Sequence, residues 1–424
     1  MLYNDRINPK GIINMNAKML WQYARLVVEV GINVQKGQPV MINCPVESAA
    51  FARMLTTAAF DAGASDVHIN WRDDYCSRQH WLHAEDAAFD AVAPWEVMKR
   101  MELAKKGVGI ISIAASDPEN LKGVDPERLR RYNSAAGRDL KEFSRLQMSN
   151  AIPWCVVSVP VVSWAKKVFP ELDEEAAMER LWEEIFKSVR ITEDGDAVAE
   201  WRAHCERIEG YAKRMTEYDF AELHYKNSIG TDLTVKMPEN HMWLAGGDYC
   251  KGVKFVANMP TEEVFSAPLR TGVDGTLVAA KPLVLNGNVV EGIRFRFENG
   301  RIVDIHADTN EETLRGEVDL DEGSHYLGEI ALVPYDSPIS NSGILFFNTL
   351  FDENAACHFA FGEAYPACIK GGDDLSVEEL KAAGINAESD THVDFMVGTA
   401  DLEIVGKTRD GRLVKVFENG NFAI

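Results

Sequence analysis

The stretch GQPVMINCPVESAAFARMLTTAAFDAGASDVHINW, residues 37–71, decides the fold of the first half of the chain. Its apolar run after a glycine turn, residues 37–45, predicts a buried strand. The apolar spacing over residues 48–64 predicts a helix that ends at Gly63. Residues 65–71 predict a second strand. Two short strands joined by a helix are typical of a parallel pair in a sheet that helices cover.

The same alternation continues on both sides of this unit. Apolar residues at helical spacing predict a helix over residues 19–33, and apolar runs predict strands over 107–115 and 153–161. The sequence therefore predicts an N-terminal α/β domain with a mostly parallel sheet. Neither a GxGxxG nor a GxxxxGK[ST] pattern follows any of these strands, which argues against nucleotide binding.

The pattern changes in the second half. Residues 170–215 read as charged helices, residues 220–238 as two strands around NSIG, and residues 275–307 as strand-rich runs between turns. We therefore predict domains at 1–215 and 216–424, the second an α+β domain rich in β-structure.

Charge and cysteine usage restrict the class of protein. The chain of 424 residues has 66 acidic residues against 44 Lys and Arg, a net charge of −22, which argues against nucleic acid or an anionic membrane as partner. Its seven cysteines form no CxxC pair, as expected of free buried thiols in a reducing compartment. The first residues show no secretory signal, and no apolar stretch is long enough for a membrane helix. A cytoplasmic protein is expected.

The motif THVDFMVG, residues 391–398, holds the first pair of candidate metal ligands. On a strand, His392 and Asp394 share a face and can present an imidazole and a carboxylate to one ion, while Val393 packs into the core. A His-x-Asp pair also occurs by chance on solvated strands, so this motif alone does not establish a site.

Further candidates lie in three other segments. They are Glu262 and Glu263 in PTEEVFSAP, Glu329 in LGEIALVP, and His358 and Tyr365 in NAACHFAFGEAY. If the last segment is helical, its two candidates lie about two turns apart on one face. The two neighbouring glutamates would point in opposite directions on an extended backbone, so only one joins a given site. Each residue also has a structural interpretation: a solvated strand end, a core histidine, or a core tyrosine with a bonded hydroxyl.

Taken together, three carboxylates, two imidazoles and a phenol suit a pair of borderline divalent cations better than one structural zinc. Structural zinc sites prefer thiolates, and the cysteines offer no suitable pair. A carboxylate can also bridge two ions.

Long motifs carry a resemblance to a known family. PTEEVFSAP, LGEIALVP, FFNTLFDENAACHFAFGEAY and HVDFMVG resemble, in order, the metallo-aminopeptidase family that includes aminopeptidases T, aminopeptidases S and PepS-type enzymes. YARLVVEVGINVQKGQPVMI and DAGASDVHINWRDD resemble its N-terminal domain. The resemblance spans essentially the whole chain.

The resemblance implies a metal site and its chemistry. Its ligands would be the carboxylates and imidazoles of Glu263, Glu329, His358, His392 and Asp394. It implies two divalent ions per subunit (Zn, Co, Mn or Mg), a homodimer, and removal of single residues from the free N-terminus of short peptides.

The candidate residues allow more than one catalytic role. Tyr365 would lie near the metals and either donate to the tetrahedral intermediate or bind a metal weakly, and Glu329 would serve as bridge and proton acceptor. Glu262 reads as a surface or dimer-contact acid. Two alternatives are a metal-free peptide-binding protein and a two-metal phosphoesterase, the latter because Lys251, Lys254 and Arg270 border the first motif.

Overall fold

The computed structural model describes residues 17–285 and 287–424 and divides into two compact units. The first comprises residues 17–203 and 247–260, and the second 204–246 and 261–424. The division falls within helix α9 (Ala197–Tyr218), which also contains the sequence-based boundary at 215. The N-terminal residues that were inspected for a secretory signal lie outside the described range.

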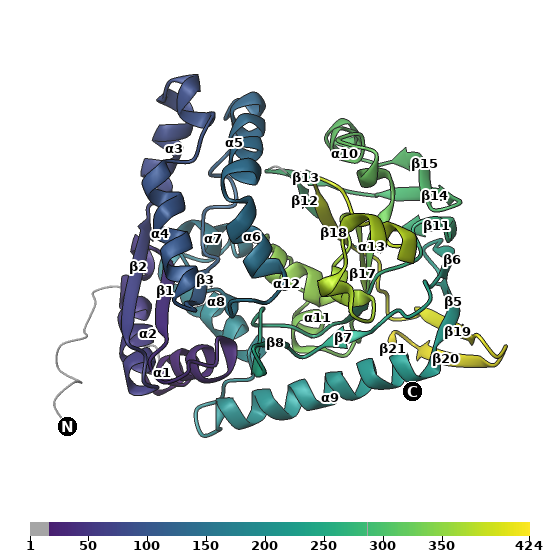
Figure 1. Ribbon diagram of the computed structural model, residues 1–424, viewed down its shortest axis with the longest axis horizontal. Coiled ribbons are helices and arrows are strands. Elements are labelled where there is room, and N and C mark those ends of the chain that lie inside the picture. The colour runs from purple at the N-terminus through teal and green to yellow at the C-terminus, as the bar shows by residue number, and fades with distance from the viewer. Residues whose placement is uncertain (1–16, 286) are drawn as a thin grey trace. The chain divides into compact units, whose positions relative to one another are not determined.

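The first unit is built on a four-stranded sheet in the order β2-β1-β3-β4, and every pair is parallel. Figure 1 labels the first three of these strands. The strands are β1 (Pro39–Pro45), β2 (Asp66–Arg72), β3 (Gly109–Ile113) and β4 (Trp154–Val157). Helix α2 (Ala49–Asp61) joins the first two strands and buries its apolar face. The strand–helix–strand unit and the parallel sheet are therefore confirmed.

The helices of the first unit otherwise follow the predicted alternation. Their bounds are α1 (Ala17–Leu26), α3 (Asp74–His83), α4 (Pro94–Lys105), α5 (Pro126–Asp139), α6 (Lys141–Met148), α7 (Val162–Val168) and α8 (Glu174–Ser188). The helix expected over 19–33 is shorter, because α1 passes into a π-helical turn at Val27–Gly31. A Cβ at Gly31 would lie 2.9 Å from Cys155 Sγ, so the close approach to β4 requires glycine here.

The second unit contains an eight-stranded antiparallel sheet in the order β15-β14-β11-β6-β5-β19-β20-β21. Its strands are β5 (Phe220–Lys226), β6 (Asp232–Lys236), β11 (Val273–Val278), β14 (Arg294–Glu298), β15 (Arg301–His306), β19 (Glu403–Thr408), β20 (Leu413–Glu418) and β21 (Asn421–Phe422). The pair of strands around NSIG is confirmed as β5 and β6.

A second antiparallel sheet in this unit has the order β18-β17-β16-β10-β7. Its strands are β7 (Leu244–Ala245), β10 (Val264–Ser266), β16 (Leu327–Leu332), β17 (His358–Gly362) and β18 (His392–Met396). One face packs on the eight-stranded sheet: the rings of Tyr225 and Phe359 lie 5.1 Å apart, as do those of Phe295 and Phe395. The hydrophobic core of the unit lies between the two sheets.

Short elements complete the fold. Two hairpins are β8 (Asp248–Cys250) with β9 (Val253–Phe255) in the first unit and β12 (Leu283–Leu285) with β13 (Asn288–Val290) in the second. The helices of the second unit, besides α9, are α10 (Glu311–Val318), α11 (Pro338–Ser342), α12 (Thr349–Asp352) and α13 (Val377–Ala383). Six of the seven cysteines are buried and Cys76 is exposed, and none of the seven forms a disulfide.

The conditional helix over ACHFAFGEAY was wrong. Residues 358–362 form β17, which pairs with β16 on one side and β18 on the other. All five residues are buried, so neither face of the strand carries the polar alternation that marks a strand in a sequence. His358 and Tyr365 therefore do not share a helix face.

Candidate metal centre

Strand register brings the predicted ligands to one face of the five-stranded sheet. Glu329 on β16 lies opposite Ala360 on β17, which lies opposite Asp394 on β18. Side chains opposite one another across antiparallel strands project to the same face, and so do residues two apart on a strand. His358 and His392 therefore share this face with the two carboxylates, and the small Ala360 side chain lies between Glu329 and Asp394.

Glu263 reaches the same face from a segment outside the strands. Phe265, Ala331 and His358 are in register across β10, β16 and β17. Glu263 precedes β10 by one residue and lies two before Phe265, and its carboxylate approaches the imidazole of His358. All five predicted ligands thus converge, although they come from four segments of the chain.

The ligand atoms form two groups that share one carboxylate. His358 Nε2 lies 3.3 Å from Glu263 Oε2 and 3.6 Å from Glu329 Oε1. His392 Nε2 lies 3.4 Å from Glu329 Oε2 and 3.6 Å from Asp394 Oδ1. Within each group the ligand atoms lie within 4.8 Å of one another. Each oxygen of Glu329 therefore faces a different imidazole.

Both imidazoles are oriented by backbone carbonyls. The Nδ1 atom of His358 lies 3.2 Å from the carbonyl oxygen of Ala356, and that of His392 lies 2.7 Å from the carbonyl oxygen of Glu363. Since a carbonyl only accepts, each Nδ1 carries the proton and donates it. Nε2, turned toward the carboxylates, is then the atom available as a metal ligand.

The electrostatics of the cluster favour positive charge among its carboxylates. Burial raises the pKa of the Glu263 carboxyl. Burial alone would also raise the pKa of Glu329, but hydrogen bonds from His358 and His392 lower it to about 2. Burial opposes charge on His358 and His392, yet the surrounding carboxylates raise the pKa of both imidazoles well above its usual value. The carboxylates thus favour positive charge at both imidazoles, and divalent cations bound among them would supply such charge.

The donor set fits divalent cations of the first transition row or magnesium. It offers three carboxylates and two imidazoles. The neighbouring thiol of Cys357 bonds to Val333 instead, with Sγ lying 3.3 Å from the carbonyl oxygen. His358 is almost fully buried and His392 about one-quarter exposed, so the cluster is in contact with solvent on the His392 side.

Tyr365 lies beside this cluster, as the sequence predicted, but on a loop after β17. Its ring meets that of His392 edge-on at 5.3 Å, and the ring of Phe265 at 6.0 Å. Burial, followed by the negative charges of Glu329 and Asp394, raises the pKa of the Tyr365 phenol well above its usual value. The phenol therefore keeps its proton and remains a hydrogen-bond donor.

Glu262 does not match its predicted role as a surface acid. Its side chain is buried, and Oε2 lies 3.7 Å from Nε2 of His204 on α9. The two neighbouring glutamates do have different partners, His204 for the first and His358 for the second, as an extended backbone requires. The run of acids in TEEV could not show that Glu262 is taken into the interior.

A functional candidate that the sequence interpretation missed is Glu353, in the 3₁₀ turn Glu353–Ala355 after α12. Its carboxyl lies close enough to the cluster for the charges of Asp394 and Glu263, after burial, to raise its pKa well above the usual value. Asn354 Nδ2 donates to its Oε1 at 3.3 Å. In FDENAAC it looks like any acid of a helix end, and only the packing of the turn against β18 indicates a role.

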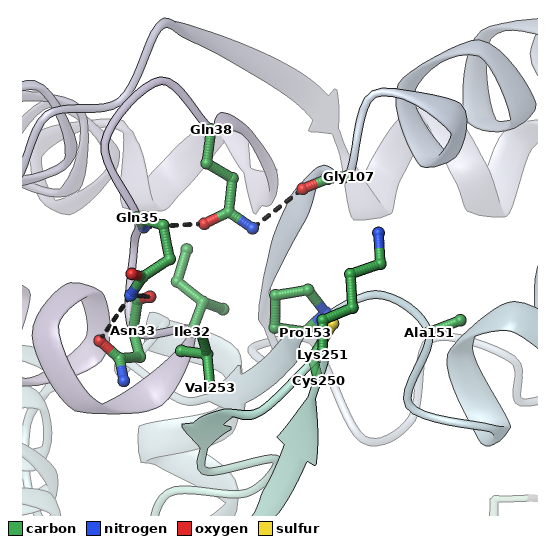
Figure 2. A pocket seen from close by; sticks show the side chains of 10 residues that line it. All are labelled: Ile32, Asn33, Gln35, Gln38, Gly107, Ala151, Pro153, Cys250, Lys251 and Val253. Carbon is green, nitrogen blue, oxygen red and sulfur yellow. Dashed lines mark hydrogen bonds between the residues drawn. The ribbon is translucent and has the colours of Figure 1, made fainter.

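A separate small cavity lies in the first unit, with a volume of about 110 Å³. Its polar wall is internally bonded, because Gln38 accepts from the backbone N–H of Gln35 and donates to the carbonyl of Gly107 (Figure 2). Lys251 and Cys250 line the opposite side. The residues that line it include none of the predicted ligands.

In the described part of the chain, no helix combines the length and apolar character that crossing a bilayer requires.

Comparisons with known proteins identify the family to which the chain belongs. The family model described as "Thermophilic metalloprotease (M29)" matches residues 16–422. The chain is 47% identical to aminopeptidase AmpS of Bacillus subtilis (95% of this chain and 97% of the relative), and 37% identical to aminopeptidase T of Thermus aquaticus over the same shares.

The fold is also that of a solved relative. The structure of wild-type AmpT from Thermus thermophilus superposes with a TM-score of 0.89 at 36% identity, covering 96% of this chain and 99% of that one. Near full-length similarity at this level, together with the converging carboxylates and imidazoles, leaves one assignment: the chain belongs to the M29 family of thermophilic metalloproteases and is a metallo-aminopeptidase.

Proposed function

We propose that the protein hydrolyses the N-terminal peptide bond of short peptides with water activated by two divalent ions. The observation that carries this proposal is the position of Glu329. Its two oxygens face imidazoles of two different ligand groups, at 3.6 Å and 3.4 Å. A carboxylate shared in this way is suited to bridge two ions.

One ion would be held by Glu263, Glu329 and His358, and the other by Glu329, His392 and Asp394. Zn, Co, Mn and Mg all accept such oxygen and nitrogen ligands, so the native ion stays open. When bound, a pair of such ions lowers the pKa of a bound water toward neutrality and polarises the scissile carbonyl.

Two side chains would take part directly. Hydrogen bonds that lower the pKa of Glu329 keep it a carboxylate, which suits it to bind metal; its second role as proton acceptor stays a prediction, because a carboxylate of low pKa is a weak base. Tyr365 keeps its phenolic proton and can donate a hydrogen bond to the oxygen that becomes negative in the tetrahedral intermediate.

The charge and the burial of the site favour short peptides with a free N-terminus as substrates. The acidic cluster and the net charge of −22 favour the ammonium group of a free peptide N-terminus. Partial burial of the ligands favours short peptides over folded chains. The cytoplasmic location and the homodimer stay predictions.

The phosphoesterase alternative gains no support from Arg270, one of the three residues that suggested it. Arg270 stacks on the ring of Tyr326 at 3.6 Å and donates through Nε to Asn386 at 3.1 Å, so its guanidinium is already engaged. Lys251 and Lys254 belong to the β8–β9 hairpin of the first unit.

Chelation followed by restoration tests the proposal. Activity on aminoacyl-nitroanilides should disappear when the protein is stripped of metal and return as about two equivalents of Zn, Co, Mn or Mg are added. The matched assay uses a nitrophenyl phosphate with each ion. Full peptidase activity after chelation would refute a metal mechanism, and turnover of the phosphate ester alone would favour the phosphoesterase.

A further inference from the structure

The five proposed ligands are held in two different ways. Four of them lie on β16, β17 and β18, whose backbones are fixed by hydrogen bonds to neighbouring strands. The fifth, Glu263, belongs to the segment Thr261–Glu263, which lies between the end of the first unit and β10 without regular structure. An irregular backbone has no ladder to set the direction of its side chains, so something else must fix this carboxylate.

The first anchor of this segment is His204 on α9. Arg207 Nη2 lies 2.8 Å from His204 Nδ1, and because a guanidinium only donates, Nδ1 must accept. The ring proton is therefore on Nε2, which donates to the carbonyl oxygen of Thr261 at 2.8 Å. His204 is 2% exposed, so this bond is shielded from competing water.

The second anchor is Asn354, which is fully buried. Its Oδ1 accepts the backbone N–H of Glu262 at 2.7 Å. Its Nδ2 donates to the carbonyl of Leu350 at 3.1 Å and to Oε1 of Glu353 at 3.3 Å. The orientation of the amide is fixed by its partners, since a backbone N–H requires the oxygen and a carbonyl requires the nitrogen.

We infer that His204 and Asn354 are positioning residues that fix the backbone before Glu263 and thereby set the metal affinity of the group Glu263–Glu329–His358. This inference rests on the proposed two-ion function. Neither residue is among the proposed ligands; each acts through the backbone of Thr261 or Glu262. The group Glu329–His392–Asp394 has no member in this segment, so it should depend on the anchors less.

The test is calorimetric titration of metal-free full-length protein with Zn²⁺. Wild type should bind two equivalents. Asn354→Leu and His204→Leu introduce an apolar side chain that removes the bonds, and each should weaken one equivalent by about 10- to 100-fold, the range found for outer partners of metal ligands, while changing the other little. Glu263→Gln should weaken the same equivalent, which identifies it.

Two further variants distinguish a positioning role of the buried anchors from a general loss of structural stability. His204→Gln retains an N–H donor for the Thr261 carbonyl and should recover most of the affinity. Asn43→Leu is the matched control: its amide donates to Ser112 at 3.0 Å and accepts from Asn70 at 2.9 Å, all within the first unit, and it should leave both equivalents unchanged.

The outcomes are distinct. Unchanged affinities in both leucine variants, or equal weakening of both equivalents, would overturn the inference while leaving the two-ion function standing. If Asn354→Leu does not fold, the comparison of His204→Leu with His204→Gln decides. A wild-type protein that binds no pair of zinc ions would instead refute the proposed function itself.

Discussion

The candidate metal centre has a strand side and an irregular side, and the two are stabilised by different means. On the strand side, Glu329, His358, His392 and Asp394 point to one face because register and alternation leave them no other direction. On the irregular side, individual hydrogen bonds take the place of a ladder: Asn354 accepts from the backbone N–H of Glu262, next to Glu263, and donates to the carboxyl of Glu353. The contrast implies that the sheet fixes the direction of its side chains through many backbone hydrogen bonds. Outside the strands, a single substitution that removes one hydrogen bond can change the position of a carboxylate.

The largest effect is expected from Glu329→Gln, since this residue joins both ligand groups. We expect kcat/KM to fall by about 10²–10⁴-fold if the carboxylate is also the proton acceptor. Metal content should be measured in the same sample, with Glu263→Gln, which affects one group, as the comparison. Full activity in metal-loaded Glu329→Gln would exclude the proton-accepting role.

The next effect is expected from Tyr365→Phe, which removes one hydroxyl and keeps the ring contacts with Phe265 and His392. Loss of a donor to the intermediate should lower kcat by about 10²–10³-fold, with KM and metal content nearly unchanged. A fall in metal content that matches the loss of activity would show that the phenol acts as a ligand instead.

A smaller effect concerns Asp352, which precedes Glu353 on the irregular side. Burial raises its pKa to about 7, although the backbone N–H groups of Phe346 and Asn348 and the nearby Lys281 oppose the shift. Because the folded pKa exceeds the usual value of 3.8, this carboxyl contributes stability that is full below pH 3.8 and is lost as the pH rises to about 7.

Asp352→Asn removes this titration. The wild type should be the more stable protein at pH 5, and the difference should shrink or reverse by pH 8, as measured by urea unfolding of both proteins at each pH. A stability difference that is constant between pH 5 and 8 would show that Asp352 is not responsible for a pH response of this turn.

The smallest effect is expected from salt. If the net charge of −22 assists the binding of cationic substrates, KM should rise modestly as ionic strength increases beyond about 0.1 M, where the Debye length is near 10 Å. A neutral, N-acetylated peptide binding as an inhibitor serves as the control. Equal salt dependence for both ligands would assign no role to the acidic surface.

Much of this architecture could be predicted from local patterns. The prediction of two strands and a helix over residues 37–71 is confirmed, because the apolar pattern and the turn glycines indicate the same elements. HVD indicated two ligands on one strand face, and β18 confirms that geometry. HFAFG was misread because a strand buried on both faces has no polar alternation, and its small residues suit a helix equally well.

The sequence by itself determined the layered α/β unit, the β-rich second unit, the family, and the chemical types of the candidate ligands. Periodicity and motifs are local properties, so they can be read before the chain folds. Only the tertiary structure decided that Glu329 faces two imidazoles, that Glu262 is buried beside His204, and that Glu353 and Asn354 belong to the centre. These facts depend on contacts between segments as many as 92 residues apart, and register and packing across such distances leave no signal in a local pattern.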